Sequence, residues 1–269
     1  MERLKRIAAL AAVALLLGIY VSTFVFAISK SPMAPSLFKA SLGCTILVPV
    51  LLYAFLLAVR MARPSKSAVI DTLIFDVGSV LLYFPWREYA ENMDISQDAK
   101  DFIVENVLYH PLFAECDLGI KSFEELLHDF CAIGPRYENE IRRLIETMYT
   151  CVEPYPYTDS WLAGLKRTGY RLYILSNWSE HAYEKLKENG VMDFEKYMDG
   201  GKWSFREHLR KPDRAFFEKL LADYRIDRSR AVFLDDNPEN VAAATKLGIR
   251  SILFRDYEDA KSRLKELGV

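Results

Sequence analysis

The segment Val69–Leu82, with the sequence VIDTLIFDVGSVLL, determines which fold we expect for this chain. Its first half, Val69–Phe75, is rich in β-branched and aromatic residues and has the length of a buried parallel strand. The apolar run stops at Asp76, which places a carboxylate at the end of that strand. Ligands of open α/β sheets bind at the carboxyl ends of the strands, so Asp76 is a candidate site residue.

Further apolar runs and helical patterns alternate along the rest of the chain. The other strands that we predict are Arg171–Leu175, Ala231–Leu234 and Arg250–Phe254. The helices that we predict among them are Thr158–Arg167, Ser179–Asn189, Asp213–Tyr224 and Pro238–Leu247. This alternation predicts an α/β fold with a Rossmann-like parallel sheet.

A long stretch, Phe84–Tyr155, separates the first predicted strand from the second and has no strand signal. Helical spacing appears at residues 98–107, 122–133 and 137–149, and Ser122 with Glu125 forms a capping-box pattern. The stretch is too long for a loop, so we expect an inserted helical module. The predicted domains are residues 67–83 with 156–269 for the α/β core and 84–155 for the insert.

Polar side chains stand at the ends of the predicted strands and before one helix. They are Asp76, Ser176, Asn177, Lys211, Asp235 and Asp236. Clustered carboxylates repel one another and need a cation, and hard oxygen ligands select Mg²⁺. A carboxylate can also attack phosphorus, while an ammonium, a hydroxyl and backbone N–H groups hold phosphate oxygens. This combination indicates phosphoryl transfer.

The four segments IFDVGSVL, YILSNW, LRKPDRAFF and VFLDDNPEN, in this order, resemble the motifs of the haloacid dehalogenase (HAD) superfamily of phosphohydrolases. The resemblance runs from about Val69 to the C-terminus. It is closest to the helical-cap subgroup, which includes sugar-phosphate phosphatases whose first motif reads Phe-Asp-x-Gly-x-Val. It implies a Mg²⁺-dependent phosphatase of a small phosphorylated metabolite, for which a sugar phosphate is one candidate, with an aspartyl-phosphate intermediate.

The resemblance also implies roles for single residues. Asp76 would be the nucleophile, Ser176 and the Asn177 amide would bind the transferring phosphoryl group, and Lys211 would neutralise both that group and Asp76. These residues make up the predicted catalytic and phosphate-binding set.

The predicted metal ligands come from two of the motifs. Asp76 and the backbone carbonyl of Gly78 belong to the first, and Asp236 with the adjacent Asp235 belongs to the last. Gly78 is a departure from the family pattern, because most phosphatases of the superfamily have a second Asp there as general acid and base. General acid–base help is typically worth about 10²–10⁴-fold in rate.

Three consequences of Gly78 stay open. The substrate has a good leaving group, another group such as His181, Glu115 or Asp117 replaces the missing acid, or the protein is slow or inactive. The last alternative describes a membrane-bound interaction or regulatory module. A carbon–halogen hydrolase of the same superfamily is a further alternative, but it needs no metal, and the pair Asp235–Asp236 argues against it.

The first 66 residues differ in character from the rest. They contain eight Lys and Arg but one acidic residue, and two uncharged runs at residues 7–28 and 40–59 are each close to the length that spans a bilayer. The short link Ser29–Lys39 predicts a hairpin of two transmembrane helices. The excess of basic residues outside the link places both ends, and the catalytic domain, in the cytoplasm. The alternative is a cleaved signal peptide, but its apolar core would be unusually long.

The remaining composition excludes other classes of function. Residues 67–269 carry 27 Lys and Arg against 36 Asp and Glu, whereas a nucleic-acid footprint is normally basic. The four cysteines lack the spacing of a disulfide framework or a zinc site, so we expect free thiols. The expected partners are thus a small phosphorylated metabolite and the membrane, and the oligomeric state stays open.

Overall fold

The structure is a computed structural model that describes residues 17–62 and 69–269. The chain divides into two compact units, Met1–Ser67 and Ala68–Val269, and each is described by itself.

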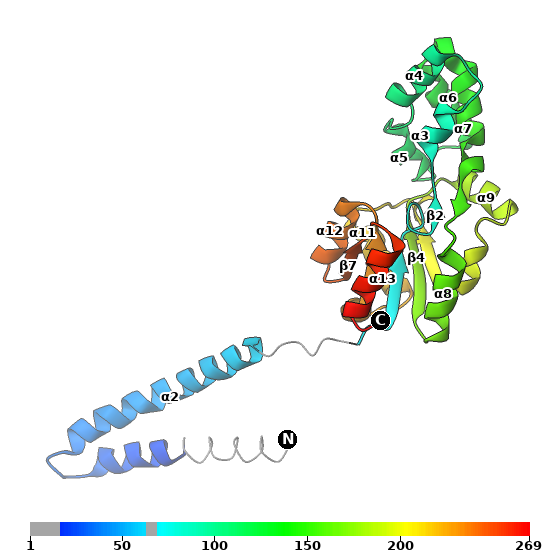
Figure 1. Cartoon of the computed structure of the whole chain (residues 1–269). Coiled ribbons are helices and arrows are strands. Elements are labelled where there is room, and N and C mark those ends of the chain that lie inside the picture. The colour runs from blue at the N-terminus through cyan, green and yellow to red at the C-terminus, as the bar shows by residue number, and fades with distance from the viewer. Residues whose placement is uncertain (1–16, 63–68) are drawn as a thin grey trace. The chain divides into compact units, whose positions relative to one another are not determined.

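The second unit is built on a five-stranded parallel sheet in the order β5-β4-β1-β6-β7 (Figure 1). Its strands are β1 Thr72–Phe75, β4 Arg171–Ser176, β5 Gly200–Trp203, β6 Ala231–Asp235 and β7 Arg250–Leu253. Strand β1 is central and buried at every position, as its apolar sequence predicts. The predicted α/β fold with a parallel sheet is confirmed.

Helices cover both faces of this sheet. Helices α8 Thr158–Arg167, α9 Glu180–Glu188 and α13 Tyr257–Glu266 bury apolar side chains against one face, and α11 Arg214–Asp223 and α12 Pro238–Lys246 cover the other. The period of two along β1 divides its side chains accordingly, since Leu73 and Phe75 enter the first core and Ile74 enters the second. A short helix, α10 Ser204–Glu207, follows β5.

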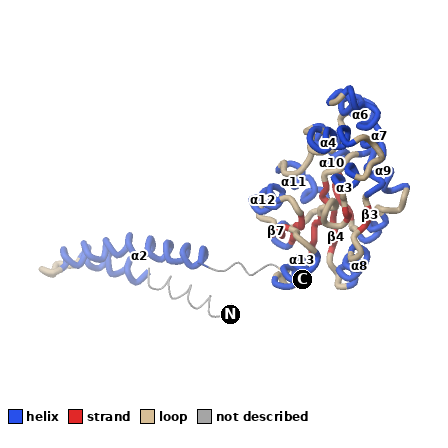
Figure 2. Tube along the Cα trace, turned by 45° about the horizontal axis from the view of Figure 1, so that its top comes forward, coloured by secondary structure: helices blue, strands red, loops and turns tan. Residues whose placement is uncertain are grey.

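A helical insert follows β1 and returns before α8 (Figures 1 and 2). It contains α3 Trp86–Glu91, α4 Gln97–Asn106, α5 Leu112–Cys116, α6 Phe123–Ile133 and α7 Glu138–Thr147. The antiparallel pair β2 Leu82–Tyr83 and β3 Glu153–Pro154 joins its two ends. The insert has a hydrophobic cluster of its own, centred on residues such as Ile103, Phe130 and Leu144. Ser122 and Glu125 make the predicted capping box of α6.

Short 3₁₀ turns complete the unit. They are Pro135–Tyr137, Met148–Cys151, Asp193–Tyr197 and Arg228–Arg230.

The predicted helices of the second unit end within two residues of the observed ones, but four expectations about strands were wrong, one of them the omission of β2. Strand β1 begins at Thr72 rather than Val69, whose side chain is exposed. Strand β3 lies inside the stretch in which we expected no strand. Strand β5 was missed because its sequence, GGKW, has two glycines and a lysine instead of a β-branched run.

The first unit contains two apolar helices. Residues Leu17–Ile28 form the described part of one, and α2 Ala34–Ala62 forms the other. The link between them is shorter than predicted, because α2 already begins at Ala34 and accommodates Pro35 in its first turn. Pro49 lies inside α2. One helix segment, Ala34–Leu51, is long and apolar enough to cross a membrane; the beginning of the predicted first span lies outside the described residues.

Candidate active site

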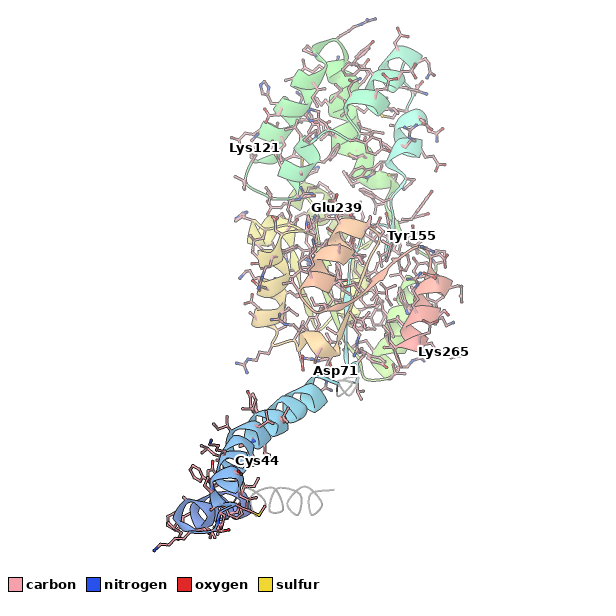
Figure 3. All side chains as sticks on the ribbon, turned by 90° about the vertical axis from the view of Figure 1, so that its left-hand side faces the viewer. Cys44, Asp71, Lys121, Tyr155, Glu239 and Lys265 are labelled. Atoms are coloured by element: carbon pink, nitrogen blue, oxygen red, sulfur yellow. The ribbon has the colours of Figure 1, made fainter. Side chains whose placement is uncertain are left out.

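The carboxyl ends of the strands face the helical insert. In Figure 3, Asp71, just before β1, lies at the far end of the sheet from the insert, whereas Glu239, just after β6, lies at the near end. Lys121 marks the insert in the same view. The polar residues that follow β1, β4 and β6 therefore converge between the sheet and the insert.

Asp76 is the centre of this cluster. Its side chain is buried, and its Oδ1 atom accepts hydrogen bonds from the Val77 N–H at 2.7 Å and the Ser176 hydroxyl at 2.7 Å. The same oxygen forms an ion pair with the Lys211 Nζ at 2.8 Å. These three partners come from the segment after β1, the end of β4 and the segment before α11. Residues about 100 and 135 positions apart in the sequence thus meet at one carboxylate oxygen.

Lys211 is almost fully buried between two carboxylates. Its Nζ lies 2.8 Å from Asp76 Oδ1 and 2.7 Å from Asp235 Oδ2. The backbone around it is held by Asn177, whose side-chain amide donates to the Lys211 carbonyl at 3.0 Å and accepts from the Lys211 N–H at 2.8 Å. The Asn177 side chain therefore positions Lys211, and the Lys211–Pro212 peptide bond is cis.

The two acidic residues after β6 differ in their surroundings. Asp235 is buried, and besides Lys211 it accepts hydrogen bonds from the Asn237 N–H and the Asn240 side-chain amide. Asp236 is exposed and lines the cavity described below. Oxygen atoms of Asp76, Asp235 and Asp236 lie within 4.8 Å of one another. Three carboxylates beside one ammonium leave two negative charges, which suits a divalent cation.

Burial and mutual repulsion shift the proton affinities of this cluster. Burial, with a contribution from the Asp76 charge, raises the pKa of Asp235 to about 7. The pKa of Asp236 is also raised, by partial desolvation of its carboxylate at the cavity wall and by the Asp76 charge, although the residue as a whole is exposed. Burial would lower the pKa of Lys211, but the carboxylates of Asp76 and Asp235 outweigh it and raise that pKa, so the ammonium stays charged. A bound cation would act in the same direction as the ammonium and favour ionised carboxylates.

The cluster opens into a cavity of about 510 Å³ that extends from Asp76 into the insert. Gly78 lines it, and a Cβ atom added there would lie 3.3 Å from Cζ3 of Trp178. Trp178 would thus be in tight contact with a side chain at position 78. The aromatic residues that line this cavity were not among the predicted site residues; the spacing of Phe123, Leu126 and Phe130 on one face of α6 was the available signal.

The three proposed substitutes for the missing acid have different environments. Glu115 is partly exposed and pairs with Lys121 at 2.7 Å. His181 stacks on Phe123, with ring centroids 3.6 Å apart, and burial is the main cause that lowers its pKa. Asp117 lines the cavity beside Asp76 and lies 3.6 Å from Arg210. Burial, assisted by the Asp76 charge and opposed by Arg210 and Lys211, raises the pKa of Asp117 to about 7.

Known proteins resemble this chain in both sequence and fold. It is 28% identical over 207 residues to drimenol cyclase of Aspergillus calidoustus, covering 74% of this chain but 37% of that longer protein. It is 26% identical to a sesquiterpene phosphatase of Aspergillus oryzae, over 72% of this chain and 94% of that protein. It is 23% identical to a chloroplast flavin mononucleotide hydrolase of Arabidopsis thaliana, over 76% and 80% of the two chains.

A HAD family enzyme of Bacteroides thetaiotaomicron, solved in complex with magnesium and inorganic phosphate, shares the fold. Its TM-score is 0.57 at 21% identity, with 71% of this chain and 98% of that chain covered. The family model of the haloacid dehalogenase-like hydrolases matches residues 70–248, which include every polar residue of the cluster above. The chain therefore belongs to the haloacid dehalogenase-like hydrolases, and its relatives include phosphatases.

Proposed function

We propose that the second unit is a Mg²⁺-dependent phosphatase that hydrolyses a small phosphorylated metabolite through an aspartyl-phosphate. The observation that carries this proposal is the shared Oδ1 atom of Asp76, which Ser176 and Lys211 both contact. A hydroxyl and a buried ammonium that converge on one carboxylate also converge on a phosphoryl group brought to that carboxylate.

Asp76 attacks the phosphorus in this mechanism. An Asp76 oxygen forms a bond to phosphorus while the ester bond to the substrate alcohol breaks, and the departing oxygen takes a proton. Water then attacks the phosphorus of the aspartyl-phosphate, which releases inorganic phosphate and restores the Asp76 carboxylate. Ser176, Lys211 and the Asn177 backbone bind the phosphoryl oxygens, and Lys211 offsets their charge and that of Asp76.

The cluster of carboxylates fits Mg²⁺. Asp76, Asp236 and the Gly78 carbonyl are the ligands that we propose, with Asp235 supporting them. Asp235 contributes mainly by holding Lys211, because its oxygens already accept hydrogen bonds from Lys211, Asn237 and Asn240. Bound Mg²⁺ supplies positive charge between the carboxylates and the phosphate.

We assign the proton transfer to Asp117. It lies in the insert and lines the same cavity as Asp76, and the charges of Asp76 and Lys211 both influence its pKa. His181 serves this role less well, since its lowered pKa leaves it without a proton to donate at neutral pH. The insert then acts as a cap that supplies the acid and excludes water from the aspartyl-phosphate.

The first unit is proposed to be a membrane anchor. The helix Leu17–Ile28 and helix α2 leave large apolar side chains such as Phe24, Ile46 and Tyr53 mostly exposed. Thr23 and Thr45 approach within 3.4 Å, which joins the two helices into a hairpin. Six basic residues before and after the apolar runs, against two in the link, favour both ends on the cytoplasmic side, with the phosphatase there.

Phosphate release by the full chain in lipid nanodiscs tests the phosphatase. We expect turnover of p-nitrophenyl phosphate that needs Mg²⁺, stops with a chelator and is lost in Asp76→Asn. The matched control is Asp94→Asn, an exposed aspartate of the insert, which should keep full activity. A folded protein that binds Mg²⁺ without turnover would instead favour the non-catalytic module, and halide release from a 2-haloacid that survives the chelator would favour the dehalogenase alternative.

A further inference from the structure

The cavity above Asp76 is polar at one end and apolar along most of its length. Asp76, Asn177 and Asp236 stand at the polar end, while the part enclosed by the insert is lined by residues such as Trp86, Phe113, Phe130, Ile145 and Met148. At about 510 Å³, the cavity has room for much more than a phosphate group.

The aromatic side chains form a continuous wall from the catalytic loop into the insert. Trp178 lies 5.4 Å from Phe84, Phe84 lies 4.1 Å from Trp86, and Trp86 stacks on Phe113 at 5.1 Å. Phe113 in turn lies 4.8 Å from Phe130 in the middle of α6. These centroid distances leave no polar side chain between successive rings of the wall.

Gly78 and this wall belong together. Because a Cβ at position 78 would lie 3.3 Å from Cζ3 of Trp178, any side chain there would press on the indole ring, which would have to shift by a few tenths of an ångström. Gly78 therefore leaves the indole at the start of the wall in its place beside Asp76.

Polar and charged residues also line the cavity, among them Asp117, Lys121, Glu180, His181, Glu184 and Lys185, but the aromatic wall itself presents none. The indole N–H groups of Trp86 and Trp178 are buried within the protein and have no partner within the described part of the chain. The wall therefore offers an apolar surface that does not match the many hydroxyls of a sugar or ribityl chain. Burying unmatched hydroxyls is costly, so this wall selects against a polyol.

We propose that the cavity binds the hydrocarbon of the leaving group, so that the substrate is the monophosphate ester of a large apolar alcohol, such as an isoprenoid alcohol. This inference rests on the proposed phosphatase function and narrows its substrate class. The phosphate lies at Asp76, and the chain extends along the aromatic wall toward Phe130.

A series of n-alkyl phosphates from butyl to octyl, at concentrations below micelle formation, measures the contribution of the wall. Each methylene buried is worth about 0.8 kcal/mol, which is roughly fourfold in kcat/KM. We therefore expect kcat/KM to rise about two-hundredfold over the four added methylenes. Farnesyl phosphate should be hydrolysed faster than glucose 6-phosphate or flavin mononucleotide at equal low concentration.

Two phenylalanines of the insert give a matched pair of variants. Phe113 and Phe102 are both partly buried against the same cluster, but only Phe113 is among the residues that line the cavity. Phe113→Ala should flatten the rise of kcat/KM with chain length, whereas Phe102→Ala should leave it unchanged. Because the readout is a slope across substrates, a general loss of stability in either variant does not produce it.

The outcomes separate this inference from the phosphatase proposal. Hydrolysis of p-nitrophenyl phosphate that depends on Mg²⁺ and Asp76 supports the phosphatase proposal by itself. If kcat/KM then does not rise with alkyl chain length, or if glucose 6-phosphate or flavin mononucleotide is preferred, the apolar-substrate inference is wrong and the phosphatase proposal stands. If nothing is hydrolysed, binding of alkyl phosphonates is followed by the fluorescence of Trp86 and Trp178. Affinity that rises with chain length supports the apolar site, and chain-independent affinity overturns it.

Discussion

Lys211 is the residue on which the charge balance of the site depends. It is buried and lies within 2.8 Å of both Asp76 and Asp235, so it compensates two buried carboxylates. Breaking a buried ion pair by removing one partner leaves uncompensated charge and is strongly destabilising. We therefore expect Lys211 to stabilise the fold as well as to bind phosphate.

Lys211→Met should lower the free energy of unfolding by about 3–5 kcal/mol and abolish phosphate release. Urea unfolding of the full chain in nanodiscs, followed by tryptophan fluorescence, measures the loss, because all four tryptophans lie in the second unit. Lys219→Met is the control: its surface ion pairs should be worth at most about 1 kcal/mol. Equal losses in the two variants would contradict the assigned role of Lys211.

Asp117→Asn tests the proton donor proposed in place of an acid at position 78. Alkyl phosphates release a strongly basic alkoxide and need the proton, whereas p-nitrophenolate leaves without it. We expect the variant to lose about 10²-fold or more in kcat/KM for octyl phosphate and little for p-nitrophenyl phosphate. A loss of the same size for both substrates would indicate a structural role.

The pH dependence of the same pair provides a second readout. Asp117, with a pKa raised to about 7 mainly by burial, holds its proton below that pH and loses it above. Arg210, Lys211 and Asp76 face it, and Mg²⁺ beside Asp76 would lower the pKa further. For octyl phosphate, kcat/KM should therefore fall as the pH rises through about 7 or slightly below, and this limb should be absent in Asp117→Asn.

The edge strand β5 shows, at the scale of an element, how a residue without a side chain permits close packing. Gly201 lies opposite Ile174 of β4, and a Cβ added to it would lie 2.7 Å from the Ile174 Cβ. Gly201 is one reason why β5 could not be predicted from the sequence, and the same glycine allows β5 to pair closely with β4. Strand β5 is followed by Ser204, whose hydroxyl accepts a hydrogen bond from the backbone N–H of Trp178 at 2.9 Å. This hydrogen bond helps to hold Trp178 in the wall of the cavity.

Gly201→Ala should destabilise the second unit by about 1–3 kcal/mol, because the added methyl group overpacks the contact between β4 and β5. Gly164→Ala is the matched control: it lies in α8 with open space around its Cα, and alanine should stabilise that helix by about 0.5–1 kcal/mol. Urea midpoints of the two variants should therefore move in opposite directions. A neutral or stabilising Gly201→Ala would contradict the packing argument.

The whole molecule combines a hydrolase with two apolar helices, and the orientation of these helices decides which compartment the hydrolase faces. Ser31, in the link between the helices, should be outside the cytoplasm if both ends are inside. Ser31→Cys, in a chain whose four cysteines are replaced, should react with an impermeant maleimide added to intact cells. Ser229→Cys, in the second unit, should react only after the membrane is opened; the reverse pattern would contradict the proposed topology.

The sequence by itself determined the α/β fold, the positions of most helices and the membership of the polar site. Strand ends, caps and apolar periods are local patterns. Asp76, Ser176 and Asp235 could be named because each stands at the end of a predicted strand, and Lys211 because it stands just before a predicted helix. Only the tertiary structure decided that these four residues touch, that Asn177 positions Lys211 and that Asp235 differs from Asp236. These are contacts across the sheet.

The cavity was likewise beyond the reach of the sequence. An aromatic residue of a helix looks the same in a sequence whether it fills a core or lines a pocket, because both need an apolar face at helical spacing. What separates Phe113 from Phe102 is the packing of the insert above the sheet, and what makes Gly78 informative is the position of Trp178. The proposed chemistry of this protein therefore rests on residues that the sequence places at strand ends, while the proposed class of substrate rests on how distant helices pack.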